Sequence, residues 1–216
     1  MNDKDIMKYA VAFTYGDGCI IRHGKECRFE ATCIEDNMDY INWRKCILEN
    51  ITPINTYENK DSRPNRKLLI KTSSRTHPTY TKIYSRMYHN GRKTVDPHYL
   101  KLFDWETLAI FYMDDGNLQN VTQSYKENKY SNKYPNIASM SFSYAENIML
   151  KETIKKNLGI EFNVRKHSER EDGTINYMLY LAGSSRQSFY SNISKYILPS
   201  FRYKLDNSYD VLPFVG

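Results

Sequence analysis

Two aspartates stand at corresponding places in this chain, each at the end of an apolar segment. Residues 108–118 read LAIFYMDDGNL and contain Asp115, and residues 10–20 read AVAFTYGDGCI and contain Asp17. A helix that ends this way carries carboxylates at its C-terminus, where the macrodipole is already negative, so the placement lowers stability. We therefore expect these carboxylates to have a function, and the binding of a divalent cation is the chemistry that suits them.

Other features of the sequence repeat together with the aspartates. The helix-like segment TYTKIYSRMY resembles FYSNISKYIL, and each is soon followed by a lysine, Lys93 in HNGRKTV and Lys204 in PSFRYKL. The chain is therefore interpreted as two diverged copies, residues 1–100 and 101–216.

Within each copy the residue patterns predict the element order αββαββα, which is an α+β fold. The hairpins are expected to turn at residues 23–25 and at Asp172-Gly173. The extra length of the second copy falls at residues 120–136, which are polar and rich in turn-forming residues, and they predict a loop. The other predicted elements are a hairpin at residues 19–34, helices at 37–51 and 145–160, a strand at 66–74 and a hairpin at 161–183.

Composition excludes several classes of protein. The chain has 216 residues and is 40% hydrophobic, which is enough for a sizeable core, and it contains no apolar run that predicts a transmembrane helix. The four cysteines form no CxxC pair, so we expect reduced thiols and no zinc site. The N-terminus lacks a signal or transit pattern, which favours a protein that works where it is made.

The charge of the chain is unevenly distributed. Net charge is +6 with a pI near 9.0, and residues 60–93 contain ten Lys or Arg residues and one acid. This excess suits a polyanion, most simply nucleic acid, although a solvated basic surface explains the composition equally well.

At this point the sequence resembles the LAGLIDADG homing endonucleases, in the branch with two motifs on one chain. The resemblance rests on LAIFYMDDG and AVAFTYGDG, on RFEATCIEDNMDYINW after the first motif, and on HNGRKTVDP and LPSFRYKL. It is closest to the group that contains the yeast mitochondrial omega-intron endonuclease. The resemblance implies two αββαββα halves related by a pseudo-twofold axis, with the motif helices packed together and the strands forming a curved DNA-binding surface.

The resemblance also implies an activity and a set of site residues. The expected activity is metal-dependent double-strand cleavage, with short 3′ overhangs, at a long asymmetric target, which initiates homing of an intron or gene. Two motifs on one chain imply a monomer. Mg²⁺ is the expected metal, and we expect Mn²⁺ to substitute for it. The expected metal ligands are the carboxylates of Asp17 and Asp115 with the carbonyls of Gly16 and Asp114, and the expected catalytic residues are Asp17, Asp115, Lys93 and Lys204.

Strand residues that could face a DNA groove are the candidates for binding. They are Arg22, Lys67, Lys71, Arg75, Arg165 and His167, which can read base edges or neutralise phosphate. Glu30, Glu35 and Asp36 lie where the family carries residues that organise water, but salt bridges explain them equally well. Tyr80, Tyr84 and Tyr190 are interpreted as packing residues.

Two alternatives to a nuclease remain open. An RNA maturase that assists splicing of a group I intron would use the same fold and the same basic residues, with intron RNA as its partner. A DNA-binding regulator that has lost cleavage is the second, but such a protein would tolerate loss of an aspartate, and both are present. The expected partner is double-stranded DNA, with no membrane. The expected location is an organelle such as the mitochondrial matrix, or a phage or bacterial cytoplasm, without secretion.

Overall fold

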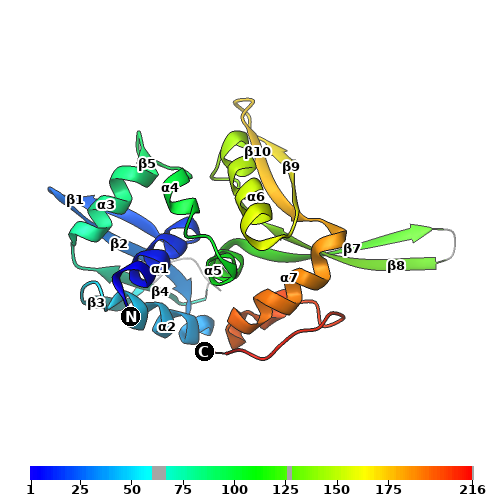
Figure 1. Cartoon of the computed structure of the whole chain (residues 1–216), viewed down its shortest axis with the longest axis horizontal. Helices are drawn as coiled ribbons and strands as arrows, with labels where there is room; N and C mark the ends of the chain where they lie inside the picture. The colour runs from blue at the N-terminus through cyan, green and yellow to red at the C-terminus, as the bar shows by residue number, and fades with distance from the viewer. Residues whose placement is uncertain (60–66, 126–127, 216) are drawn as a thin grey trace. The chain divides into compact units, whose positions relative to one another are not determined.

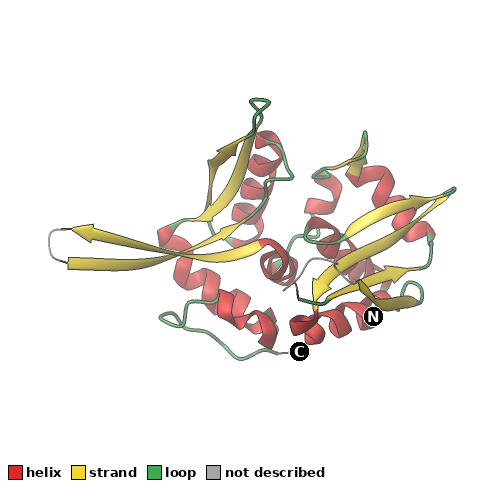
Figure 2. Cartoon of the chain, turned by 180° about the vertical axis from the view of Figure 1, so that it is seen from behind, coloured by secondary structure: helices red, strands yellow, loops and turns green. Residues whose placement is uncertain are grey.

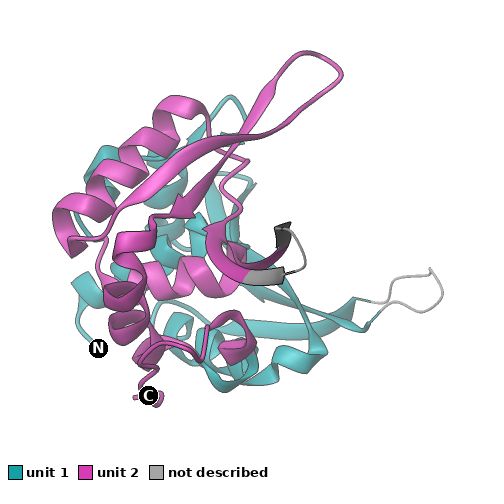
Figure 3. Ribbon diagram, turned by 90° about the vertical axis from the view of Figure 1, so that its right-hand side faces the viewer, with its two compact units in different colours: residues 1–102, 198–200 teal, residues 103–197, 201–216 magenta. Residues whose placement is uncertain are grey.

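The computed structural model describes residues 1–59, 67–125 and 128–215. The chain divides into two compact units (Figure 3). The first unit comprises Met1–Leu102 with Leu198–Ser200, and the second comprises Phe103–Ile197 with Phe201–Gly216. Each unit contains one αββαββα series with an antiparallel sheet, which confirms the predicted fold class (Figure 1, Figure 2).

The first unit has a four-stranded sheet in the order β1-β2-β4-β3. Its first hairpin turns at Gly24, whose φ of 65° lies in the left-handed region. A second, short hairpin turns at Asn90 and Gly91, with φ values of 51° and 76°, as in a type I′ turn. The elements are α1 (Asp3–Tyr15), β1 (Cys19–His23), β2 (Glu26–Ile34), the 3-10 helix η1 (Glu35–Asn37), α2 (Met38–Leu48), β3 (Ile54–Asn59), β4 (Leu69–Ser74), α3 (Pro78–Met87), β5 (Tyr88–His89), β6 (Arg92–Lys93) and α4 (Pro97–Leu100).

The second unit repeats this strand order as β7-β8-β10-β9. Its helix α6 begins with a capping box, in which the side chains of Ser143 and Glu146 each accept a hydrogen bond from the other residue's backbone N–H. Gly159 ends the helix in the left-handed conformation. The elements are α5 (Trp105–Asp115), β7 (Gly116–Tyr125), β8 (Asn128–Ile137), α6 (Tyr144–Leu158), β9 (Phe162–Glu169), β10 (Ile175–Leu181), the 3-10 helix η2 (Gly183–Ser185), α7 (Arg186–Ile193) and the 3-10 helix η3 (Ser194–Tyr196). The last 3-10 helix, η4 (Pro199–Lys204), begins in the first unit and continues into the second from Phe201.

The prediction of a polar loop at residues 120–136 is wrong. Apart from residues 126–127, which lie outside the described residues, the segment belongs to β7 and β8, two strands of ten residues each that extend away from the rest of the second unit (Figure 1). The segment has no alternation of apolar and polar residues, so the sequence pattern alone did not indicate strands. Backbone pairing between β7 and β8, which a periodicity argument does not detect, holds these strands together.

In each unit the helices cover one face of the sheet. In the first unit the ring of Phe29 on β2 lies near Phe13 of α1 and Tyr80 of α3, with centroid distances of 6.5 and 6.2 Å. In the second unit Phe162 on β9 packs near Phe189 of α7 at 6.2 Å. Because side chains alternate along a strand, the neighbours of these residues point to the opposite face, which we call the open face.

Several smaller expectations can be compared with the structure. Among the described residues no helix is both long and apolar enough to cross a membrane. All four cysteines are free thiols, and only one of them, Cys27, is buried. The packing role expected for the tyrosines is confirmed for Tyr80 and Tyr190, which are fully buried, whereas Tyr84 stacks on Tyr88 at 4.9 Å and is half-buried.

Candidate functional site

Each motif helix is followed by a glycine that lies against the last turn of that helix. A Cβ atom on Gly18 would lie 2.4 Å from the Phe13 carbonyl oxygen, and one on Gly116 would lie 2.2 Å from the Tyr112 carbonyl oxygen. Gly116 has a φ of −76°, so close approach and not a left-handed backbone requires the absence of a side chain. The Asp-Gly pair therefore sets the direction in which the chain leaves each helix.

The two motif helices end at different points relative to their aspartates. α1 ends at Tyr15 with Gly16 as its C-cap, so Asp17 lies just beyond the helix and is exposed. α5 continues to Asp115, and both Asp114 and Asp115 are half-buried. Neither last turn contains a basic residue. At each helix end the negative charge of the carboxylate therefore adds to the partial negative charge of the helix dipole, and a cation from another part of the chain is needed to offset both.

Lys93 supplies that cation at the end of α1. Its Nζ donates hydrogen bonds to the carbonyl oxygens of Gly16 at 2.6 Å, Gly18 at 3.3 Å and Tyr15 at 3.4 Å. The ammonium thus lies among the carbonyl oxygens at the negative end of the helix that precedes Asp17.

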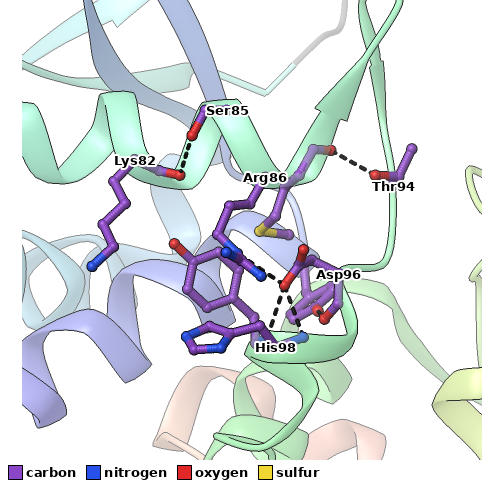
Figure 4. Close-up of polar contacts among 9 residues, drawn as sticks. Lys82, Ser85, Arg86, Thr94, Asp96 and His98 are labelled. Atoms are coloured by element: carbon purple, nitrogen blue, oxygen red, sulfur yellow. Dashed lines mark hydrogen bonds and ion pairs between the residues drawn. The ribbon is translucent and has the colours of Figure 1, made fainter.

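The segment that carries Lys93 is anchored on its C-terminal side. Thr94 donates to the carbonyl oxygen of Met87 through its backbone N–H at 2.7 Å and its hydroxyl at 3.1 Å. Asp96 accepts from Arg86 Nε at 3.3 Å and also caps α4 by accepting from its first backbone N–H groups (Figure 4). These contacts tie the hairpin to α3 and hold Lys93 in place.

Lys204 supplies the corresponding cation at the end of α5. Its Nζ donates to the carbonyl oxygens of Met113 at 2.5 Å and of Tyr112 and Asp114 at 3.4 Å. The Tyr112 hydroxyl donates back to the Lys204 carbonyl oxygen at 2.8 Å, and burial raises the pKa of this phenol well above its ordinary value, so the hydroxyl keeps its proton. Lys204 is 8% exposed, and its Nζ lies 5.2 Å from the centroid of the Phe201 ring.

The donors at the two helix ends suit a hard divalent cation. Among the described residues no group of three or more His, Cys, Asp and Glu side chains could hold a metal ion. Each helix end instead offers a carboxylate and a set of carbonyl oxygens that already surround an ammonium group. Few protein carboxylates together with carbonyl oxygens are typical of Mg²⁺ sites, where water and substrate phosphates complete the coordination. The residues present therefore fit such an ion.

The DNA-binding candidates of the first unit differ in their surroundings. Lys71 Nζ lies 2.6 Å from the carboxylate of buried Glu30, and this hydrogen bond raises the pKa of the lysine. Lys67 forms an ion pair with Asp36. Arg75 is exposed just after β4. Salt bridging is thus confirmed for Glu30 and Asp36, and Lys71 and Lys67 present charge that is partly offset.

Arg22 does not share the open face of the first sheet with Lys71. It pairs across the strands with Cys27, so its side chain shares the face that carries Phe29. Its guanidinium lies 5.3 Å from the ring centroid of Tyr84 on α3. Arg28 on β2 does lie on the open face, and its guanidinium is 2.7 Å from Glu30. Its position two residues before Glu30 in the strand could have identified it.

In the second unit, both candidates lie exposed on β9. The guanidinium of Arg165 lies over the Tyr180 ring, 5.5 Å from its centroid, and His167 is near the irregularity between β9 and β10. Arg186, at the first position of α7, was not identified from the sequence, and its guanidinium lies 4.7 Å from the ring centroid of Tyr134. No sequence pattern connects α7 with β8.

Comparison with known families and proteins gives a consistent result. Residues 15–189 match the model of the LAGLIDADG DNA endonuclease family. The cytochrome b mRNA maturase bI2 of Debaryomyces hansenii is 23% identical over 140 residues, which are 64% of this chain and 47% of the maturase. The probable intron-encoded endonuclease 1 of Wickerhamomyces canadensis is 24% identical over 159 residues, 72% of this chain and 63% of that protein. The matches thus span less than two thirds of either relative.

Solved structures show the same fold. The homing endonuclease I-WcaI bound to its DNA recognition sequence superposes with a TM-score of 0.75 at 19% identity, over 97% of this chain and 88% of that one. The meganuclease I-SmaMI bound to uncleavable DNA has a TM-score of 0.59 at 12% identity, over 91% and 85% of the two chains. I-SmaMI bound to uncleaved DNA in the presence of calcium ions has a TM-score of 0.52 at 14% identity, over 96% and 86%.

Proposed function

The chain belongs to the LAGLIDADG DNA endonuclease family, and on that premise we propose that it is a site-specific DNA endonuclease. It cuts both strands of a long asymmetric target, leaves short 3′ overhangs, and so initiates homing of the intron or gene that encodes it. The observation that carries this proposal is the matched arrangement at the two motif helices. Each helix end combines an aspartate, a closely packed glycine and a lysine bound to the terminal carbonyls.

In this proposal each aspartate and its neighbouring carbonyl would hold divalent metal at the end of its own motif helix. Asp17 and Asp115 contribute carboxylates, and Gly16 and Asp114 contribute carbonyl oxygens. Endonucleases of this family use a divalent metal, and we propose Mg²⁺, with Mn²⁺ able to substitute. When bound there, divalent metal would supply Lewis-acid chemistry, which would activate the attacking water and stabilise the leaving 3′ oxygen.

The two lysines act through their fixed positive charge. The carbonyl contacts hold each ammonium beside the aspartate of its own unit, where a scissile phosphate bound to that end would gain charge in the transition state. A preorganised cation at this place stabilises the transition state more than the bound substrate. Lys93 and Lys204 are therefore proposed as the electrostatic catalysts.

The sheets provide the nucleic-acid contacts in this proposal. The DNA-binding residues are Lys67, Lys71, Arg75, Arg165 and His167, to which the open-face position of Arg28 adds one cation. Because one chain carries both motifs, the protein acts as a monomer on one asymmetric duplex, whereas a single-motif protein would need a dimer. The relative named as intron-encoded supports a gene located within an intron, and we propose an organelle as the location.

A maturase function is the second candidate because one relative is named as an mRNA maturase. The intact aspartates and lysines favour the nuclease, and they favour it over a DNA-binding regulator that does not cleave. The test is an assay of supercoiled DNA that carries the uninterrupted host sequence, with Mg²⁺ or with EDTA. Linear product only with Mg²⁺ supports the nuclease. Absence of cleavage together with accelerated splicing of the intron transcript would replace it with the maturase.

A further inference from the structure

The second unit has a cavity on the open face of its sheet, at the place where β10 leads into α7. Its volume is about 510 Å³, and it lies within a single unit. All four strands of the sheet and the first residue of α7 supply the polar side chains that line it. We call this pocket the arginine–tyrosine cavity. Its polar lining residues are Gln119, Tyr134, Asn163, Arg165, Tyr180 and Arg186.

Two guanidinium groups in this cavity are held by aromatic rings and not by carboxylates. Arg186 lies over Tyr134 and Arg165 lies over Tyr180, at 4.7 and 5.5 Å from the ring centroids. No Asp or Glu is among the lining residues that the structure describes. Arg186 Nε is buried, and within the described part of the chain it has no hydrogen-bond partner. An acceptor from outside the chain would therefore be favourable here.

The open face of the first unit is arranged in the opposite way. There Arg28 and Lys71 both contact the buried carboxylate of Glu30, at 2.7 and 2.6 Å. The Glu30 carboxylate neutralises one of these two positive charges, although Arg28 Nε, like Arg186 Nε, is buried without a hydrogen-bond partner among the described residues. The two sheets thus share a topology but present different chemistry to a nucleic acid.

A guanidinium presents a planar hydrogen-bonding edge that suits two neighbouring acceptors, and a ring beneath it restricts its motion. Guanine offers such a pair in the major groove through O6 and N7, and the amides of Gln119 and Asn163 can pair with adenine in the same way. We propose that this cavity reads base identity for the chain, with Arg186 as a specificity-determining residue that binds a guanine edge. The proposal rests on the DNA-binding function proposed above.

A selection from a randomised duplex library tests the assignment. Wild-type protein and the Arg186→Lys variant are each equilibrated with the library in Ca²⁺, and bound DNA is sequenced. The lysine keeps the charge but loses the planar edge, so guanine preference should disappear at one position of the selected site. Affinity for the wild-type site should fall on the order of 5- to 150-fold, the usual worth of a bidentate base contact. Affinity for scrambled DNA and its salt dependence should not change.

Two further sets of variants distinguish base reading by this cavity from a general effect of losing an arginine or a ring. Arg170→Lys makes the same change in the β9–β10 turn, outside the cavity, and should leave the selected sequence unaltered. Tyr134→Phe should behave as wild type, whereas Tyr134→Leu, confirmed to be folded by its melting curve, should lose the same guanine preference as Arg186→Lys.

The outcomes distinguish this inference from the proposed function. If Arg186→Lys selects the wild-type sequence with wild-type affinity, Arg186 contacts phosphate or nothing, and the assignment of base reading is overturned while the nuclease proposal stands. If wild-type protein enriches no sequence at all, the sequence-specific function fails and the inference fails with it.

Discussion

Replacing Lys204 by methionine should destabilise the second unit, because the lysine is the cation at the end of α5. Methionine retains much of the apolar packing, including the contact with Phe201, but removes the charge and the donors to Met113 and its neighbours. A cation at a partly buried helix C-terminus is worth up to about 2 kcal/mol. A hydrogen bond to a charged group is worth roughly 1.5–3 kcal/mol. Both contributions arise from the same ammonium acting on the same carbonyl groups, so they do not add in full. We expect the free energy of unfolding to fall by about 3 kcal/mol.

Lys93→Met should lower the free energy of unfolding by less than Lys204→Met does. Lys93 makes an equivalent set of contacts, with Gly16 as its shortest, but it is half-buried whereas Lys204 is 8% exposed. Water can replace an exposed ammonium and screens its charge, which reduces the expected loss to about 1 kcal/mol. Burial, and not the number of hydrogen bonds, therefore determines the ranking of the two variants.

Differential scanning calorimetry of the metal-free protein measures both effects. For a chain of this size each kcal/mol shifts the melting temperature by roughly 2–4 °C, so Lys204→Met should melt about 6–12 °C lower. Lys155→Met, which removes an exposed ion pair with Glu161 in the same unit, is the control and should leave the melting temperature unchanged. Equal melting temperatures for Lys204→Met and wild type, or a larger loss for Lys93→Met, would refute the reasoning.

The described contacts lead to three other expected outcomes. Gly116→Ala should cost on the order of 3 kcal/mol, because the new methyl group would meet the Tyr112 backbone, and wild-type stability would contradict the close approach. Gly183→Ala is its control, since nothing lies near that position. Glu30→Gln should lower the melting temperature, because it removes the carboxylate that pairs with Arg28 and Lys71. It should also make the slope of log K against log salt steeper by up to about 0.9, because one more positive charge becomes available to DNA. An unchanged slope would show that Arg28 and Lys71 do not contact DNA phosphate. Ca²⁺ at 100 times its Kd should stabilise the wild type by about 2.7 kcal/mol and so raise its melting temperature, and EDTA should reverse the rise. An unchanged melting temperature would count against a metal site.

Local rules and the internal repeat account for most of what could be predicted. Glycines at the hairpin turns, such as Gly24 and Gly173, adopt positive φ as their sequence context indicates. The recurrence of Asp-Gly predicted two equivalent helix ends, and both have the closely packed glycine that such a repeat implies. The family resemblance is confirmed by the match over residues 15–189.

The remaining features depend on contacts between distant residues. The length of β7 and β8 is set by pairing of polar strands, which carry no periodic signal. The face on which Arg22 lies follows from its register with Cys27, and an error of one residue reverses the face. The contact of Arg186 with Tyr134 joins a helix to a strand far away in the sequence, so it could be found only from the structure.

Asp17 and Asp115 are each proposed to hold divalent metal that is needed for DNA cleavage and not for DNA binding. The most direct test measures both activities for Asp17→Asn and Asp115→Asn on the target selected by the wild type. Binding in Ca²⁺ should persist in both variants, because it rests mainly on phosphate contacts made elsewhere. Double-strand cleavage in Mg²⁺ should be abolished in both. Cleavage at the wild-type rate by either variant would contradict the assignment of these aspartates.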